Sequence, residues 1–170
     1  MTENTMIEFT KVIEKDFPDL ATLAKRLWHC AFDNLIGKAQ ADYMIEKFQS
    51  ETAFFRQTQS EGYTYYFIKH ENENVGYTAI ANRKGEGRLF LSKLYLAPEV
   101  QGKGIAVKTL NFILEKTKEL KKRAVYLTVN KGNARAIAVY EKFGFNRIDA
   151  VVTDIGNGFV MDDYIYQYDL

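Results

Sequence analysis

Sulfur and imidazole ligands are scarce in this sequence of 170 residues. Cys30 is the only cysteine, so no intramolecular disulfide and no cysteine-based metal cluster can form. The two histidines, His29 and His70, lie far apart in the sequence, which argues against a zinc site. His29 and Cys30 are neighbours, but consecutive residues of a helix point in different directions. We therefore expect no nucleophilic pair here, with Cys30 packed in a helix, His29 on its surface and no metal bound.

Linkers, apolar runs and excess charge are also missing. The chain has two prolines and no repeat or low-complexity stretch, which predicts a single domain over residues 1–170. No run approaches the roughly 20 apolar residues of a membrane span. Residues 1–11 include Glu3 and Glu8 and lack the apolar core of a signal peptide. These absences predict a cytoplasmic protein with no membrane partner.

The charge balance bears on possible partners. Lys and Arg number 23 against 22 Asp and Glu, a formal net charge of +1. A chain so balanced has no general attraction for a polyanion. We therefore expect no nucleic acid partner.

Hydrophobic periodicity predicts a mixed α/β protein. Alternating or β-rich segments predict strands at 7–12, 63–69, 75–82, 88–96, 125–129, 145–153 and 159–168. Helical spacing predicts helices from Asp16, as N-cap with Pro18 in the first turn, to Phe32, then at 40–48, 104–120 and 134–143. Ser50 and Glu51 are a candidate start for a shorter helix. The predicted order is β-α-α-β-β-β-α-β-α-β-β, which is typical of a mixed sheet with helices on both faces.

An anion-binding loop is expected where the strand at 88–96 gives way to a helix. The first amides of a helix lack internal partners, and the helix dipole adds partial positive charge there. Gly102 and Gly104 carry no side chain, so a phosphate can approach the backbone directly. Val107 replaces the third glycine of the dinucleotide fingerprint, and Ile105 replaces the lysine of the kinase-type phosphate loop. Both of those better-known motifs are thus excluded.

Two blocks in this region resemble the GNAT acetyltransferase superfamily. The family's pyrophosphate loop reads Gln/Arg-x-x-Gly-x-Gly/Ala after a strand that ends near proline, and residues 94–98 followed by Gln101, Gly104 and Ala106 match it. A second family pattern, Asn-x-x-Ala-x-x-x-Tyr-x-x-x-Gly-Phe, matches residues 133–145. The resemblance covers roughly 88–145 through these motifs and the remainder through topology. Residues 156–164 also look like bacterial members related to polyamine acetyltransferases.

The resemblance implies the GNAT fold and direct transfer of an acetyl group from acetyl-CoA, as cosubstrate, to a primary amine of a small molecule. In the family, the strand before the loop splays from its neighbour, and its freed backbone groups bind the pantetheine arm. The amide of Leu96 would stabilise the tetrahedral oxyanion, and Tyr140 would donate a proton to the departing thiolate. The implied cofactor-binding residues are Leu94, Tyr95, Leu96, Gln101, Gly102, Lys103, Gly104, Ile105, Ala106, Asn133, Ala136 and Tyr140.

The base that deprotonates the amine is not evident from the resemblance. Many relatives carry a Glu four residues before Leu94, where this chain has Phe90. Strand alternation places Asp162 and Asp163 on opposite faces, so one of them shares the apolar face. We expect deprotonation through water and include neither aspartate among the predicted catalytic residues.

The acceptor amine is not specified by the sequence. The resemblance locates its pocket near Trp28, Phe32, Asp33, Tyr43 and the closing hairpin, where aromatic and acidic side chains suit a cation. One alternative is a non-catalytic acetyl-CoA sensor or scaffold of the same fold. Another is a protein or aminoacyl-tRNA acetyltransferase, although the near-zero net charge disfavours RNA. The sequence does not specify the oligomeric state, and a homodimer is the candidate assembly.

Overall fold

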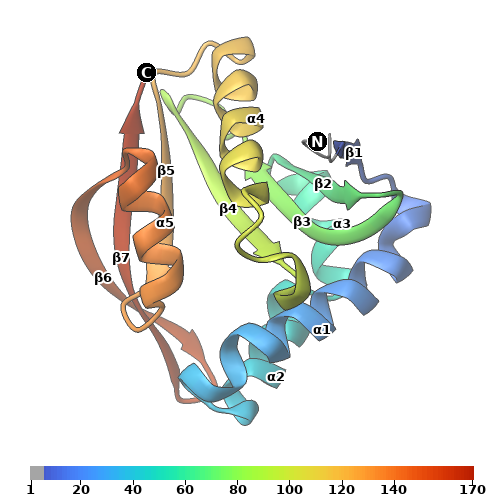
Figure 1. The fold of residues 1–170 in the computed structure, drawn as a ribbon. Coiled ribbons are helices and arrows are strands. Elements are labelled where there is room, and N and C mark those ends of the chain that lie inside the picture. The colour runs from blue at the N-terminus through green and yellow to red at the C-terminus, as the bar shows by residue number, and fades with distance from the viewer. Residues whose placement is uncertain (1–5) are drawn as a thin grey trace.

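In the computed structural model, which describes residues 6–170, seven strands form one sheet in the order β1-β2-β3-β4-β5-β7-β6 (Figure 1). The strands are β1 (Ile7–Lys11), β2 (Tyr63–His70), β3 (Glu73–Ala81), β4 (Arg88–Leu96), β5 (Ala124–Asn130), β6 (Asn146–Gly156) and β7 (Phe159–Asp169). The helices are α1 (Phe17–Ile36), α2 (Lys38–Phe48), α3 (Glu51–Ser60), α4 (Ile105–Glu119) and α5 (Ala134–Phe143), with short 3-10 turns at Glu14–Asp16 and Pro98–Val100. Glu3, one of the residues that argue against a signal peptide, lies outside the described residues.

The sheet consists of two antiparallel parts joined by one short parallel contact. β1 to β4 pair antiparallel in sequence order, and β7 pairs antiparallel with both β5 and β6. Between the two parts, β4 and β5 pair in parallel only where 88–90 meet 124–126. Beyond Phe90 the two central strands diverge, which leaves a gap in the middle of the sheet (Figure 1).

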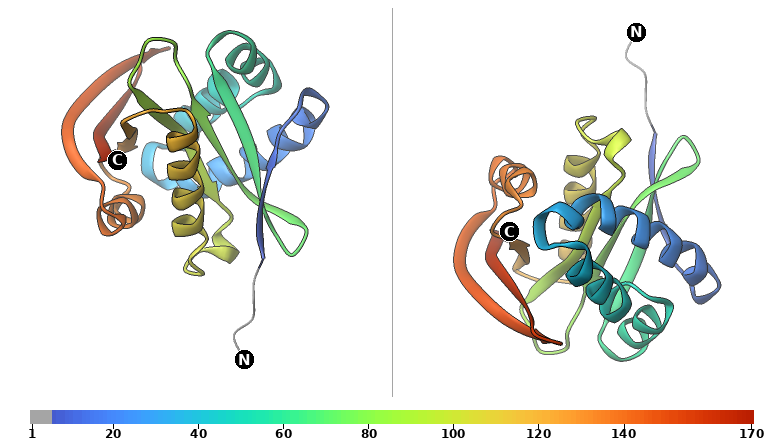
Figure 2. Two further views of the ribbon diagram at one scale, coloured as in Figure 1. Left: turned by 90° about the horizontal axis from the view of Figure 1, so that it is seen from above. Right: turned by 90° about the horizontal axis from the view of Figure 1, so that it is seen from below.

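Helices cover both faces of the sheet, as the mixed pattern predicts. α1, α2 and α3 lie on one face, and α4 and α5 lie on the other (Figure 2). One core packs α1 and α3 on β2 and β3, with Leu20, Phe54 and Tyr77 fully buried. A second core packs α4 and α5 on β4, β5 and β7 around Leu110 and Tyr166. Within residues 6–170, no helix is both long enough and apolar enough to cross a membrane.

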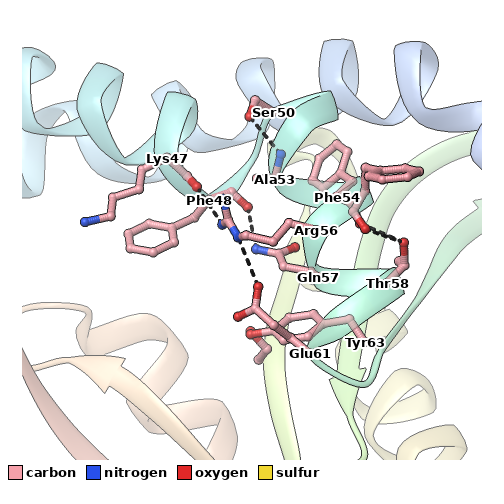
Figure 3. Close-up of polar contacts among 12 residues, drawn as sticks. Lys47, Phe48, Ser50, Ala53, Phe54, Arg56, Gln57, Thr58, Glu61 and Tyr63 are labelled. Atoms are coloured by element: carbon pink, nitrogen blue, oxygen red, sulfur yellow. Dashed lines mark hydrogen bonds and ion pairs between the residues drawn. The ribbon is translucent and has the colours of Figure 1, made fainter.

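The predicted element order omits one helix, α3, which precedes β2 and begins at the candidate start that Ser50 and Glu51 indicate. The hydroxyl of Ser50 accepts a hydrogen bond from the amide of Ala53 at 3.2 Å, which caps the start of α3. At the α2–α3 corner, Gln57 Nε2 donates to the carbonyl of Phe48 at 3.2 Å (Figure 3). Arg56 donates to the carbonyl of Lys47 at 3.2 Å (Figure 3). These contacts fold α3 back against α2.

Three details of the first helix differ from expectation. α1 continues to Ile36, because the stop signal is Gly37, whose φ of 86° suits a residue without a side chain. Asp16 precedes the helix, but its carboxylate accepts from the amide of Ile13 at 3.0 Å and does not cap α1. Cys30 is exposed rather than packed.

Candidate active site

The gap between β4 and β5 exposes backbone groups of β4. The amide of Ala97 donates to Val75 on β3 at 2.8 Å, and the direction of backbone groups alternates along a strand. Leu94 and Leu96 therefore direct their N–H and C=O groups away from β3 and into the gap. The carbonyl of Leu96 accepts from Gln101 Nε2 at 3.4 Å, which ties the loop after β4 to the edge of the gap.

The loop after β4 has the geometry of an anion cradle. Gly102 and Gly104 have φ values of 81° and 76°, and a Cβ added at either would meet nothing within 4 Å. Gly104 is the N-cap of α4, and its carbonyl accepts from the amide of Lys108 at 3.2 Å. The amides of the first helical turn therefore point out of the helix end into open space. Ile105 can contribute only its backbone, because its side chain is buried in the core.

A cavity of about 270 Å³ adjoins the gap. Its apolar wall comes mainly from α1 and α2. Its polar groups come from β2, β4, β5, β7, α3 and α5, together with Gln40 and Gln49 of the α2 region. Five residues predicted for the cofactor line it, namely Leu94, Tyr95, Asn133, Ala136 and Tyr140. The loop residues Gln101, Gly102, Lys103, Gly104, Ile105 and Ala106 do not line it, and neither does Leu96. The predicted residues thus divide into a cavity group and a separate loop group.

Tyr140 and Asn133 reach the cavity from α5. Tyr140 is buried, and burial raises its pKa to about 12, so the phenol is protonated at neutral pH. Its ring packs edge-on against Phe145, with centroids 5.7 Å apart. Asn133 is the N-cap of α5, and its side-chain oxygen accepts from the amide of Ala136 at 3.2 Å. Because the side-chain oxygen of Asn133 is used in this capping bond, its side-chain NH2 group is the part that can donate a hydrogen bond to a ligand.

The two adjacent aspartates of β7 differ in environment. Asp163 lines the cavity with 5% of its surface exposed, so one aspartate does share the apolar face, as alternation predicts. Burial, reinforced by the nearby charge of Asp162, raises the pKa of Asp163 to about 6. Asp162 is exposed and forms an ion pair with Lys131 at 2.8 Å.

Lys93 is a cavity residue that the sequence pattern did not reveal. It is buried on β4, and desolvation lowers its pKa well below the usual value for lysine. Its amine contacts the carbonyl of Phe48 at 2.5 Å, the side-chain oxygen of Gln57 at 3.3 Å and the hydroxyl of Tyr65. With three internal partners, the amine is fully engaged within the protein. The only sequence signal was that Lys93 follows Leu89 and Leu91 at alternating positions of the strand, where an apolar residue is expected.

The pocket residues suggested for the acceptor are only partly brought together. Trp28 and Phe32 line the cavity, with ring centroids 4.2 Å apart. Asp33 and Tyr43 do not line it. Asp33 binds His29 Nδ1 at 2.7 Å, and the hydroxyl of Tyr43 donates to the carbonyl of Ile155 at 2.6 Å. The Tyr43 contact instead joins α2 to the β6–β7 hairpin, whose residues Met161 and Asp163 line the cavity.

Comparisons with known proteins agree with this geometry. Residues 21–145 match the Acetyltransferase (GNAT) family. The chain is 34% identical over 90 residues to the Uncharacterized N-acetyltransferase YjgM of Escherichia coli, a match over 52% of this chain and 54% of that protein. It is 35% identical over 60 residues to the Spermine/spermidine N(1)-acetyltransferase of Bacillus subtilis, over 35% of this chain and 40% of that one. The matches therefore span about half, or less, of these curated relatives.

A solved structure supports the same fold over the whole length. The PaiA N-acetyltransferase from Thermoplasma acidophilum, solved in complex with coenzyme A, superposes with a TM-score of 0.80 at 20% identity. That match covers 97% of this chain and 99% of that one. The family match over most of the chain, together with this fold, shows that the protein belongs to the GNAT acetyltransferase family.

Proposed function

We propose that this protein transfers an acetyl group from acetyl-CoA directly to a primary amine of a small molecule. The observation that carries the proposal is the continuity of three features: the anion cradle before α4, the gap between β4 and β5, and the cavity beside that gap. A pyrophosphate fits the cradle, a pantetheine arm fits the backbone groups of the gap, and the thioester then ends at the cavity. The structure of the Thermoplasma relative with coenzyme A supports this choice of cosubstrate.

The residues around the gap can serve the steps of the transfer. The amide of Leu94 faces the gap where it meets the cavity and would donate to the oxyanion of the tetrahedral intermediate. Leu96, which the sequence suggests for this role, lies outside the cavity at the loop end of β4. Tyr140 keeps its proton at neutral pH and would donate it toward the departing sulfur. Because a thiol has a pKa of about 8.5, below that of Tyr140, hydrogen-bond donation to the thiolate suffices and complete proton transfer is not required. The free amide of Asn133 would hold the pantetheine arm.

The cavity favours a small acceptor with one positive charge. Its volume of about 270 Å³ suits a small molecule better than a protein chain or an aminoacyl-tRNA. Aromatic and aliphatic side chains dominate the α1–α2 wall, and Asp163 is the one carboxylate among the described residues that line it. An extended polyamine would need an acidic partner for each ammonium. We therefore expect amines with one charge and an apolar body to outperform spermidine.

The test is thiol release from acetyl-CoA across a panel of polyamines, amino acids, aminoglycosides, arylalkylamines and peptide N-termini. We expect turnover with at least one small primary amine, and a higher kcat/KM for single-charge amines than for spermidine. Binding of acetyl-CoA without thiol release for any amine would instead support the sensor alternative. Turnover confined to peptides would move the acceptor class to proteins.

We also propose that copies of this chain associate through β6. This strand lies at the edge of the sheet, and Ile148 and Val152 on it are 50% and 63% exposed. Exposed edge strands with apolar side chains are common sites of strand pairing between chains. Light scattering in solution should give the mass of a dimer, and a monomer mass at micromolar concentration would exclude stable pairing.

A further inference from the structure

We propose that Asp163 binds the ammonium group of the acceptor and takes its proton, in the role that a β4 glutamate would otherwise fill. This inference rests on the proposed function and adds a catalytic residue to it. It departs from the water-mediated deprotonation that the sequence alone favours.

The geometry of β7 directs Asp163 into the cavity. Asp163 pairs in register with Asn130 on β5, and Asn130 also lines the cavity. Tyr164 and Tyr166 alternate onto the opposite face, where they pack in the core under α4 and α5. The carboxylate of Asp163 has no hydrogen-bond or ion-pair partner within residues 6–170, although 95% of the residue's surface is covered. A buried carboxylate is costly unless something binds it, and an ammonium in the cavity is a suitable partner.

β4 itself offers no replacement for Asp163. Its sequence from Arg88 to Leu96 contains no carboxylate. Phe90, at the position where many relatives have glutamate, lines the cavity and stacks on Tyr126 with ring centroids 4.9 Å apart. The ionisable side chains of β4 that line the cavity are Lys93 and Tyr95. The amine of Lys93 is already occupied by three contacts within the protein.

The charged and titratable groups around Asp163 come from β7, the loop after β5, β4 and α5. Asp162 on the same strand raises the pKa of Asp163, and Lys131, just after β5, lowers it. Tyr95 of β4, Tyr140 of α5 and Asp163 all line the cavity, and Tyr95 interacts electrostatically with the other two. α1 and α2 contribute only uncharged cavity residues, namely Trp28, Ala31, Phe32, Ile36, Gln40, Met44 and Phe48.

The proposed transfer conserves atoms and charge. The ammonium donates one proton to the Asp163 carboxylate, and the neutral amine attacks the thioester carbonyl, forming the C–N bond. The C–S bond then breaks and its electron pair remains on sulfur, which takes up a proton. The nitrogen loses a second proton as the amide forms. The products are the acetylated amine, free coenzyme A and one proton, which Asp163 passes to solvent.

The pKa of Asp163 suits this role. A rise from about 3.9 to about 6 makes the carboxylate roughly 100-fold more basic than an ordinary aspartate. Asp163 is still ionised at neutral pH, where an alkyl amine with a pKa near 10.4 is almost fully protonated. Below pH 6 the carboxyl group becomes protonated and loses both its charge and its basicity. The rate should therefore fall as the pH drops through about 6.

The first experiment compares pH profiles of kcat/KM in the wild type, Asp163→Asn and Asp162→Asn with the best amine of the panel. Asp163→Asn should lower kcat/KM at pH 7.5 by roughly 10²–10⁴-fold and remove the limb near pH 6. Asp162→Asn removes the neighbouring carboxylate, which is exposed, and should keep the wild-type magnitude with the limb displaced slightly downward. Identical profiles in the wild type and Asp163→Asn, rising only toward the amine's own pKa, would overturn the proposal.

The second experiment measures amine binding without turnover. Trp28 is the only tryptophan and lines the cavity, so its fluorescence should report the amine in protein saturated with coenzyme A. Asp163→Asn should weaken binding of the amine at least tenfold while leaving the affinity for coenzyme A unchanged. Equal amine affinities would overturn the proposal. A wild-type protein that binds acetyl-CoA and amine but never releases thiol would refute the proposed function, and with it the role of Asp163 as a base. In that case, weaker amine binding by Asp163→Asn would still support the binding of the ammonium group by Asp163.

Discussion

At the scale of single residues, Tyr140 offers the most direct test of the chemistry. Tyr140→Phe keeps the ring and its contact with Phe145 but removes the proton that the phenol holds up to a pKa of about 12. We expect kcat to fall roughly 10²–10⁴-fold, the usual range for a lost proton donor, with acetyl-CoA affinity unchanged. Steady-state kinetics and a calorimetric titration of acetyl-CoA measure the two effects.

Tyr168→Phe is the matched control, because Tyr168 packs on Phe143 and Phe145 and is not among the cavity residues. It should turn over at the wild-type rate. A Tyr140→Phe enzyme as fast as this control would leave Tyr140 with a packing role only.

The same scale shows what alternation in a sequence can predict. It establishes that Asp162 and Asp163 lie on opposite faces, but not which face is buried. That choice depends on how β7 pairs with β5 and on the α1–α2 corner that covers one face. Lys93 illustrates the converse, since its burial depends on partners from α2, α3 and β2 that are distant in sequence.

At the scale of elements, the start of α4 should bind the pyrophosphate. Any side chain at Gly104 would be strained by its φ of 76°, so Ala106, inside the first helical turn, is the better position to change. Ala106→Glu suits a helix N-terminus and leaves the backbone unstrained, but it places a negative charge in the anion cradle. We expect the thermal stabilisation by saturating acetyl-CoA, about 2.7 kcal/mol at 100 times Kd, to be largely lost.

Ala106→Gln has nearly the same size without the charge and should keep more of the stabilisation by acetyl-CoA. If both variants and the wild type show the same shift in melting temperature, the diphosphate binds elsewhere.

Elements with strong periodicity could be predicted within one to three residues at their ends, and α5 and β4 match at both ends. The extent of α3 is harder to predict from the sequence, because most of its residues are polar and its burial depends on packing against β2. The predicted end of α1 at Phe32 is too early, because Leu35 and Ile36 continue the apolar helical spacing beyond it. The helix stops only at Gly37, which allows a positive φ.

At the scale of the whole molecule, the site results from the way the two parts of the sheet meet. A parallel contact of only three residue pairs holds β4 to β5, and the strands then separate around the gap. The motifs at 94–106 and 133–145 indicated both sides of this gap, so the cofactor side could be expected from the sequence. The acceptor side could not, because α1, α2, β4 and β7 meet there only through tertiary packing.

The buried carboxylate of Asp163 also has a consequence for the stability of the fold. Its pKa is about 6 in the folded protein and about 3.9 when unfolded, so the folded state holds this proton more tightly. The contribution of Asp163 to the free energy of unfolding therefore decreases by up to about 3 kcal/mol as the pH rises from about 4 to 6. It stays low at higher pH. Asp163→Asn should thus unfold at higher urea concentration than the wild type at pH 7.5, with the difference shrinking near pH 4. Equal urea midpoints of the two proteins at pH 7.5 would contradict this prediction. An Asp163→Asn variant that is more stable but slower in catalysis would show that the acceptor site is maintained at the expense of stability.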